Sequence, residues 1–397
     1  MTPLTLDWLQ IIALVGAIQG FFLVAVLFTK RRNRSASRLL GAAMLSFTIY
    51  LATGVYHAAG LEGAFPHFIG VAYPLLFLFG PLVYLYAVAA ADSTRRVTRR
   101  DIVHFVPFIV VVLIALPIYL SSGPEKLAFL DRMRSGDVPP LIRAVDPFKY
   151  FSGIFYAILT LLVLKQHRAR VNDSYSSTDR VNLNWLLWLG GAAAAIWLMA
   201  IIFELLEVTQ GLRVERGDDF IALGVAIIVY SIGYRGLRQP AIFRYETAEY
   251  AVPVIAPPTE PAAASRPEPD IASRYEKSGL TDRQAAELKD ALLAVMDQDR
   301  PWQNSELTLA DLAGRLSTTP HKLSEVLNAQ LGQTFYDFVN GYRVREVQRR
   351  IAAGDARRLK MLSLALDAGF ASKSTFNVVF KKYTNQTPSD YRQAAGM

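Results

Sequence analysis

The stretch LALDAGFASKSTFNVVFKKYTNQTPSDYR, from Leu364 to Arg392, decides the fold of the C-terminal part of this 397-residue chain. It predicts a short helix, a tight turn at Gly369 and a second helix over residues 373–383. Glycine suits the turn because it tolerates the left-handed conformation at a helix end. Ser363 and Ser372 are candidate N-caps of the two helices, since a serine hydroxyl can accept an unpaired amide hydrogen.

The second of these helices has two different faces. Phe376, Val379, Phe380 and Tyr383 recur at steps of three and four residues, which predicts a buried stripe. The opposite side is polar from the N-terminal end of the helix onward. In a helix-turn-helix motif, side chains at that end reach base edges in the major groove of DNA.

A similar unit lies upstream. Thr308 should cap a helix over residues 309–316, and Thr319 a helix over 320–330. The latter begins with a proline, whose missing N–H costs nothing at the first helical position. Between the two units, residues 335–351 carry an apolar stripe that predicts a connecting helix.

Two helix-turn-helix units on a connecting helix, with LTLADLAGRLS, FYDFVNGYRV and AGFASKSTFNVVFKKYTNQTPSDYR in this order, resemble the DNA-binding domain of the AraC/XylS transcriptional regulators. The resemblance covers roughly residues 281–393. It implies that the second helix of each unit enters one of two successive major-groove segments. Carried over by position, the base-contact candidates are His321, Ser324, Glu325, Lys373, Ser374, Thr375 and Asn377. Glu325 could accept a hydrogen bond from a cytosine amino group, or it could be a solvated charge.

Charge is distributed unevenly over this domain. Residues 276–337 hold 6 Lys/Arg against 10 Asp/Glu, a net of −4, whereas residues 338–397 hold 11 against 4, a net of +7. Because phosphate neutralisation dominates affinity for nucleic acids, the connecting helix and the second unit should supply most of it. The phosphate candidates are Arg343, Arg345, Arg349, Arg350, Arg357, Arg358, Lys360, Lys381 and Lys382. The alternative for the two arginine pairs is a solvated helix face and loop.

The composition argues against a soluble enzyme. The chain is 52% hydrophobic and 19% charged, and its mean hydropathy is +0.24. It contains no Cys, which excludes disulfides, thiolate nucleophiles and Cys-based metal sites. The five His are scattered, and no phosphate-binding loop, serine-hydrolase elbow or zinc-protease motif is present. We therefore expect a protein that is not an enzyme and has no cofactor and no metal.

Seven apolar runs are long enough to cross a hydrocarbon core of about 30 Å, which takes about 20 residues. They cover residues 6–29, 38–57, 66–91, 102–120, 147–164, 185–206 and 220–234. Lys30-Arg31-Arg32, and not a cleavage site, follows the first run, so it reads as a span and not as a signal peptide. Prolines in the third and fourth runs predict kinks, which neighbouring helices in a bundle tolerate.

The positive-inside rule predicts the orientation of these spans. Arginines and lysines gather after the first, third, fifth and seventh runs, and the alternate loops are poorer in them or balanced by acids. We therefore expect a multi-pass protein of the inner (cytoplasmic) membrane, with its N-terminus outside and its C-terminal domain in the cytoplasm.

The segment after the last span is rich in Pro and Ala and lacks periodicity, which predicts a disordered tether. The predicted domains are thus a seven-span sensor domain (1–238), a flexible linker (239–275) and a DNA-binding domain (276–397). A capping box of Thr281 and Gln284 should open the helix that supports the first unit.

Two residues are candidates for receiving a signal. Gln19 lies in the middle of the first run, where polar groups are costly and often functional, and Glu204 lies near the outer end of the sixth. The alternatives are structural, since a lone Gln in a span often bonds a neighbouring helix. His and Tyr residues also gather at the predicted outer side, where Tyr is common at membrane interfaces.

The sequence therefore predicts an all-α protein with a seven-helix transmembrane bundle, a disordered linker and a C-terminal helical domain with two helix-turn-helix units. We interpret it as a membrane-bound one-component transcriptional regulator that binds promoter DNA under the control of a small-molecule or membrane signal received by the bundle. Its expected partners are double-stranded DNA, the lipid bilayer and a second copy of itself, with RNA polymerase as a further candidate. The alternatives are a transporter or membrane enzyme with a C-terminal sensing domain, and a regulator released by proteolysis of the linker.

Overall fold

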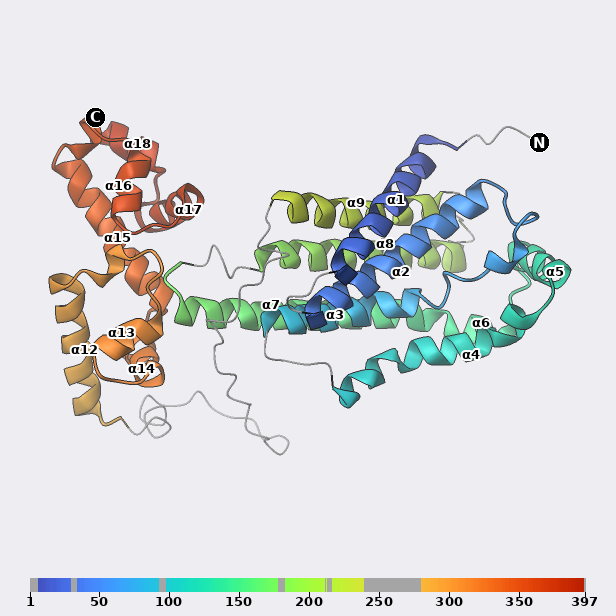
Figure 1. Cartoon of the computed structure of the whole chain (residues 1–397), viewed down its shortest axis with the longest axis horizontal. Helices are drawn as coiled ribbons and strands as arrows, with labels where there is room; N and C mark the ends of the chain where they lie inside the picture. Colours follow the sequence, from blue (N-terminus) through green and yellow to red (C-terminus); the bar gives the residue numbers. More distant parts are fainter. Residues whose placement is uncertain are drawn as a thin grey trace. The chain divides into compact units, whose positions relative to one another are not determined.

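The computed structural model of the chain describes residues 6–29, 34–92, 98–177, 183–210, 212, 216–238 and 280–395. In these ranges the chain is helical, and the only β-type pairing is one isolated bridge between Tyr175 and Thr308. The described residues form two compact units (Figure 1). Unit 1 holds residues 6–165 and 183–238, and unit 2 holds residues 166–177 and 280–395. The predicted linker over 239–275 lies outside the described residues.

Unit 1 contains the apolar helices, except for the end of α7 (Pro147–Ser174), which belongs to unit 2. Their bounds are α1 (Trp8–Thr29), α2 (Arg34–Ala58), α3 (Leu76–Ala91), α4 (Val106–Leu120, preceded by the 3-10 helix η2, Arg99–Phe105), α7 (Pro147–Ser174), α8 (Asn184–Gln210) and α9 (Gly217–Arg238). Each matches one of the seven predicted runs. In the described part of the chain, six helical segments are long and apolar enough to cross a membrane, and α3 is an apolar helix of 16 residues.

The third predicted span is helical over only part of its length. The residues before α3 form turns and the short 3-10 helix η1 (Pro66–Phe68). Gly70 there has φ of 80°, and Pro74 has no N–H to donate within a helix. Pro81 lies inside α3 and Pro117 inside α4, as expected for spans that tolerate proline.

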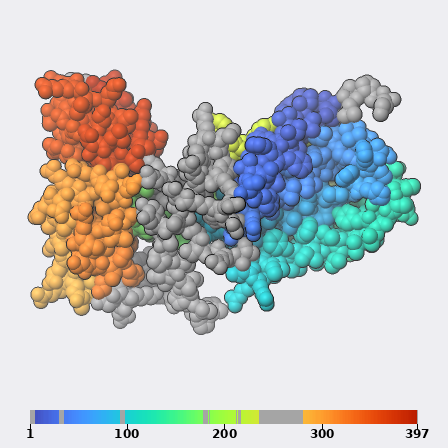
Figure 2. Space-filling view, in the orientation of Figure 1, coloured from blue at the N-terminus to red at the C-terminus, as the bar shows by residue number. Residues whose placement is uncertain are grey.

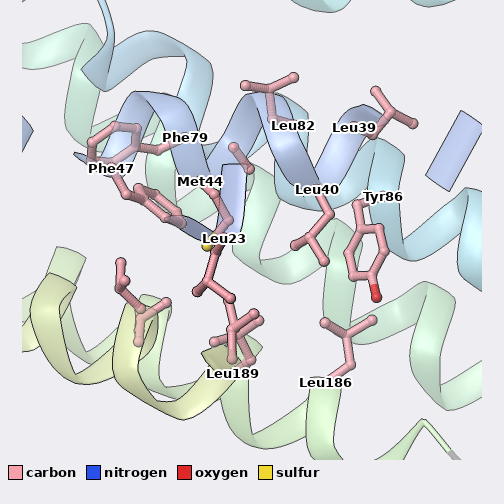
Figure 3. Packing of buried hydrophobic residues seen from close by; sticks show 14 of the residues in the cluster. Leu23, Leu39, Leu40, Met44, Phe47, Phe79, Leu82, Tyr86, Leu186 and Leu189 are labelled. Carbon is pink, nitrogen blue, oxygen red and sulfur yellow. The ribbon is translucent and has the colours of Figure 1, made fainter. Parts of the chain in front are cut away.

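The core of unit 1 lies between α1, α2, α3, α8 and α9. Figure 3 shows part of it, with Leu40, Met44 and Leu189 among the packed side chains. The rings of Phe47 and Phe79 meet edge to face, with centroids 4.6 Å apart. A β-carbon added at Gly20 would lie 2.0 Å from Thr48 Oγ1, so a small residue is what lets α1 approach α2.

The outer face of unit 1 is also apolar. Trp8, Phe22, Leu113, Phe151 and Trp188 are all at least 61% exposed. A soluble protein rarely leaves so many large apolar side chains on its surface, whereas hydrocarbon surrounds them at no such cost. This surface is consistent with a membrane domain.

The loop predicted between the fourth and fifth spans contains two helices. They are α5 (Gly123–Arg134) and α6 (Pro140–Val145). A capping box of Ser122 and Glu125 opens α5: the Ser122 N–H and hydroxyl both donate to Glu125 Oε2, at 2.7 and 2.8 Å. This local sequence signal was present and was not used in the prediction.

Unit 2 consists of short helices in two adjoining lobes, orange and red in Figure 2. Its helices are α12 (Asp282–Gln298), η3 (Pro301–Gln303), α13 (Leu309–Arg315), α14 (Pro320–Gln330), α15 (Phe335–Ala352), η4 (Asp355–Arg357), α16 (Met361–Asp367), α17 (Lys373–Thr384) and α18 (Pro388–Ala394). One core surrounds the helices around α13 and α14, and another surrounds α16 and α17. The helix α15 contributes residues to both cores.

Most predicted helix caps in unit 2 are confirmed. The capping boxes at Thr281 and Thr308 are present, and the side chains of Thr319 and Ser372 each accept a backbone N–H. The predicted cap at Ser363 is wrong, because α16 begins two residues earlier and places Ser363 inside the helix.

Candidate nucleic-acid interface

The first helix-turn-helix unit is built from α13 and α14. The turn between them includes Ser317, whose φ of 52° is left-handed, and the Thr318 N–H closes it by donating to Ala313 O at 3.0 Å. Leu323, Val326 and Leu327 bury one side of α14. The other side therefore faces outward.

The predicted base-contact residues of α14 differ in exposure. His321 is exposed, whereas Ser324 and Glu325 are half-buried. The Glu325 Oε1 atom is buried and has no hydrogen-bond partner among the described residues. An unpaired buried carboxylate oxygen is unfavourable, but the side chain of Glu325 as a whole is half-buried, so the alternative of a solvated charge stays open. Its role as a base contact stays a prediction.

The second unit is built from α16 and α17, and it depends on Gly369. This residue has φ of 91°, and a β-carbon added to it would lie 2.3 Å from the backbone oxygen of Trp302. The Ser372 hydroxyl accepts the Thr375 N–H at 3.2 Å and so caps α17. The αL conformation of Asn385 ends the helix.

The polar edge of α17 faces outward. Lys373, Ser374 and Asn377 are exposed and make no hydrogen bond or ion pair with any described residue. Thr375 is half-buried, and its hydroxyl accepts from Ser372 Oγ at 3.2 Å. Phe376, Val379 and Phe380 are buried as predicted, but the prediction for Tyr383 is wrong: it is 39% exposed, and its hydroxyl donates to Asp337 O at 2.6 Å. Three of the four predicted base-contact residues of α17 thus have free polar groups.

One residue on this edge was missed. Val378 is 71% exposed, although the residues on either side of it are polar or buried. An apolar side chain on the exposed side of a recognition helix can contact the methyl group of thymine. The signal was in the sequence, because Val378 falls outside the apolar stripe.

The phosphate candidates separate into free and paired cations. Arg357, Arg358, Lys360 and Lys381 are exposed and have no acidic partner in the part of the chain that the structure describes. The others that reach the surface have intramolecular partners: Arg345 over the Tyr342 ring, Arg349 with Glu346, Arg350 with Asp355 and Asp367, and Lys382 with Asp337. The hydrogen bond from Arg349 lowers the pKa of Glu346, so this pair stays charged at neutral pH.

Arg343 does not fit the prediction of a phosphate contact. Its side chain is 1% exposed, and all five of its N–H donors are used inside unit 2. Nε donates to Trp302 O at 2.8 Å, and the two Nη atoms donate to oxygens of Ser176, Asn304 and Asn340 at 2.8 to 3.1 Å. Burial lowers the pKa of Arg343 to about 10, so it remains protonated at neutral pH.

The partner of Arg343 comes from the end of α7. Ser176 is fully buried, and its hydroxyl donates to Leu307 O at 2.6 Å while accepting from Arg343. The Asn340 side chain donates to Ser176 O at 3.1 Å. Residues 166–177 are therefore an integral part of unit 2, although the sequence placed them in the membrane domain.

The two signal candidates lie in unit 1. The side chain of Gln19 packs against Gly233 of α9, where an added β-carbon would lie 2.0 Å from its Nε2. This position is the one expected for a residue that packs between helices. Glu204 accepts a hydrogen bond from the Tyr150 hydroxyl at 2.9 Å. Among the residues that the structure describes, no group of three or more acidic or His side chains could hold a metal ion.

Comparison with known proteins supports the reading of the C-terminal domain. A family model described as a helix-turn-helix domain matches residues 312–394. The TCP pilus virulence regulatory protein of Vibrio cholerae is 30% identical over 121 residues, which are 30% of this chain and 41% of that protein. The HTH-type transcriptional regulator YtdP of Bacillus subtilis is 28% identical over 112 residues, which are 28% of this chain and 14% of YtdP.

Another relative is described as an AraC-like transcription regulator. It comes from Streptomyces lividans and is 29% identical over 97 residues, 24% of this chain and 29% of that protein. The chain thus spans at most about two fifths of the length of these relatives. No solved structure gives a significant match. The match and the two-unit geometry concern the same residues, and the C-terminal domain of this chain is a helix-turn-helix domain of the AraC type.

Proposed function

We propose that this chain is a membrane-bound one-component transcriptional regulator. The observation that carries the proposal is the polar edge of α17, where Lys373, Ser374 and Asn377 are exposed and free. Lys and Asn side chains recognise guanine and adenine edges in the major groove. Free cations close by in the sequence, Arg357 and Arg358, suit phosphates.

A second observation supports control by the membrane domain. The helix α7 is continuous from Pro147 to Ser174; its first part belongs to unit 1 and its end belongs to unit 2. Ser176 lies two residues after the end of this helix and is buried against Arg343. A change in α7 would therefore act on the domain that carries α14 and α17. We take this connection as the route of signal transmission, which requires that the contacts of Ser176 differ between the two signalling states.

The membrane-bound form should act as a dimer. Within the C-terminal domain, residues 338–397 carry a net charge of +7 and residues 276–337 a net charge of −4, so a single domain should bind weakly. A second copy raises the effective concentration at adjacent half-sites and so raises affinity without new contacts. A signal that changes the pairing or position of the domains would then change promoter occupancy. The amount of RNA polymerase bound at the promoter would change with it.

The central experiment is genome-wide mapping of the sites that the full-length protein occupies, followed by replacement of Lys373 and Asn377 with Ala. We expect loss of occupancy and of the response of an adjacent reporter gene. Arg283→Ala is the control, because Arg283 is exposed and, among the described residues, its ion pair is with Glu287 on α12. A transporter or membrane enzyme would keep its activity in the double variant and show no occupied sites, which would sink the proposal. A blot that showed only a shortened chain in active cells would favour release by proteolysis.

The orientation can be tested separately, because the chain contains no Cys. Single cysteines at Ala64 and Arg100, both exposed, fall on opposite sides of the membrane in the proposed topology. A maleimide that cannot cross the membrane should label intact cells at Ala64→Cys and not at Arg100→Cys. The reverse pattern would place the C-terminal domain outside and exclude DNA binding in the cell.

A further inference from the structure

A cavity of about 190 Å³ lies inside unit 1, between α2, α3, α7, α8 and α9. Its wall is mostly apolar and aromatic and includes Phe47, Phe79, Tyr156 and Trp197. The first two are seen side by side in Figure 3. Apolar cavities of ~150 Å³ in proteins are large enough to bind benzene. This cavity therefore has room for an aromatic ring and a short substituent.

We place the mouth of the cavity where three helices begin, because Asp218, which lines the cavity there, is exposed. Leu76, Lys149 and Asp218, from the first turns of α3, α7 and α9, all line it. Asp218 is exposed at this mouth. Farther in, Val83, Thr160 and Gly190 line the cavity, and the Thr160 hydroxyl is already bonded to Tyr156 O at 2.7 Å. The cavity is thus polar at one end and apolar at the other.

Most polar side chains of the wall are already paired. Lys149 Nζ donates to both carboxylate oxygens of Asp146, at 2.8 and 2.7 Å. The Tyr150 hydroxyl donates to Glu204, and the Tyr156 hydroxyl bonds His104 Nδ1 at 2.9 Å. The hydrogen-bonding groups of these side chains are therefore satisfied without a ligand.

Two oxygen-bearing groups of the wall remain available. The Tyr50 hydroxyl and the Asp218 carboxylate make no hydrogen bond or ion pair with any residue that the structure describes. Both line the same cavity, and Asp218 lies near enough to Tyr50 to interact with it electrostatically. A ligand that donates hydrogen bonds at the mouth would satisfy both groups.

The charge at the mouth determines whether a cationic or an anionic ligand would bind. Of the residues that line the cavity, Asp218 is the acid and Lys149 is the base, and Lys149 is already neutralised by Asp146. The unpaired charge of the described wall is therefore the carboxylate of Asp218, which would repel an anionic ligand. An ammonium group would instead pair with Asp218 and lie against the aromatic rings of Tyr50, Tyr150 and Trp197, which attract cations.

We infer that this cavity is a binding site for a small arylalkyl or alkyl amine, with its ammonium group at Asp218 and its apolar body between Phe79 and Trp197. The inference rests on the proposed function, because the amine would be the signal that the membrane domain receives. The helix α7 lines the cavity through Tyr150, Gly153 and Tyr156, and the same helix ends next to Ser176 in unit 2. Occupation of the cavity would therefore act on the element that reaches the DNA-binding domain.

The test measures binding to the full-length protein in lipid nanodiscs by calorimetry. The probes are 2-phenylethylamine, the neutral 2-phenylethanol and the anionic 3-phenylpropanoate, which share one ring. We expect the amine to bind at least about tenfold more tightly than the alcohol, since a hydrogen bond between two charged groups is stronger than a neutral one, and the carboxylate not to bind. Tighter binding of the carboxylate, or no binding of any probe at millimolar concentration, would overturn the inference.

Two pairs of variants locate the site. Asp218→Asn should weaken amine binding about tenfold and leave alcohol binding unchanged, whereas Asp219→Asn, whose carboxylate pairs with Arg216, should change neither. Gly153→Ala should weaken both ligands, because the added carbon would lie 2.2 Å from the Trp197 ring. Gly191→Ala is its control, since nothing lies within 4 Å of the added carbon there. Equal effects of the two aspartate variants would exclude Asp218 as the amine contact.

Failure of the inference and failure of the proposed function can be told apart. Amine binding that depends on Asp218 but leaves promoter occupancy unchanged would support the cavity site and contradict its role as a sensor. Promoter occupancy by a protein that binds no amine would support the regulator and contradict the amine site.

Discussion

The guanidinium group of Arg343 holds Ser176 by both its carbonyl oxygen and its hydroxyl oxygen, at 2.9 and 3.0 Å. Arg343 belongs to the connecting helix α15, and Ser176 follows α7, 167 positions earlier in the chain. Both side chains are buried and cannot reach water. Without these hydrogen bonds, their polar groups would therefore be unpaired. Separating them would leave a buried charge with unused donors, which is strongly unfavourable. The end of α7 is thereby fixed to the DNA-binding domain.

Replacement of Ser176 with Ala should loosen this attachment. The change removes the hydroxyl that accepts from Arg343 and donates to Leu307 O, at a cost of about 1–3 kcal/mol for the donor left unpaired. Because the chain has no Cys, a cysteine placed at Ser177 can report exposure of the segment through its rate of maleimide labelling. We expect the rate to rise several-fold in Ser176→Ala and to stay unchanged in the control Ser174→Ala. Equal rates in all three proteins would show that the hydroxyl does not hold the segment.

Val378 should contribute to specificity through a thymine methyl group. In an operator found by occupancy mapping, Val378→Ala should weaken binding about five-fold, which corresponds to about 1 kcal/mol, within the range of a single base contact. Replacing the contacted thymine with uracil removes the methyl group and should weaken the wild type similarly. Val378→Ala should then show no further loss on the uracil site, because the two changes remove the same contact. Additive losses at every thymine tested would rule out this contact.

Free and paired arginines should differ in the salt dependence of DNA binding. Each phosphate contact that is lost lowers the slope of log K against log salt concentration by about 0.9. Replacing both Arg357 and Arg358 with Ala should therefore lower the slope by up to about 1.8. Arg349→Ala should change it less, because Arg349 is already paired with Glu346 at 2.7 Å. A larger effect of Arg349 than of the free pair would reverse this assignment of phosphate contacts.

Local signals made much of this fold predictable from the sequence. The caps at Thr308, Thr319 and Ser372 depend on residues three positions away, so their meaning does not change with the tertiary structure. The burial of Phe376, Val379 and Phe380 in α17 follows from helical periodicity alone. The free polar groups of Lys373 and Asn377 follow from the same pattern, because they occupy its other face.

The features that the sequence did not predict depend on contacts between residues far apart in the chain. Arg343 is basic, lies on a helix with other arginines and gave no local sign of burial; its burial depends on Ser176, which is distant in sequence. The division of α7 between two units has the same origin. The cavity in unit 1 was not predictable either, because it depends on how side chains from five helices pack.

Gly369 should be the glycine on which the second helix-turn-helix unit depends most. Alanine there would have to adopt φ of 91° and place its β-carbon 2.3 Å from Trp302 O, which is backbone and cannot move aside as a side chain could. Because Trp302 O also accepts from Arg343 at 2.8 Å, any shift of this carbonyl would disturb the Arg343 site as well. We expect Gly369→Ala to destabilise unit 2 by about 2 kcal/mol or more, from the strain of a left-handed residue and the clash together.

The loss of stability in Gly369→Ala can be measured by limited proteolysis of the full-length protein along a temperature series. The measured quantity is the midpoint temperature at which the C-terminal domain becomes cleavable. The matched control is Gly314→Ala within α13, where nothing lies within 4 Å of the added carbon. Alanine is favoured over glycine in a helix by about 0.5–1 kcal/mol, so this variant should match or exceed the wild-type midpoint. If Gly369→Ala kept the wild-type midpoint, the tight approach of the α16–α17 turn to Trp302 could not be a requirement of the fold.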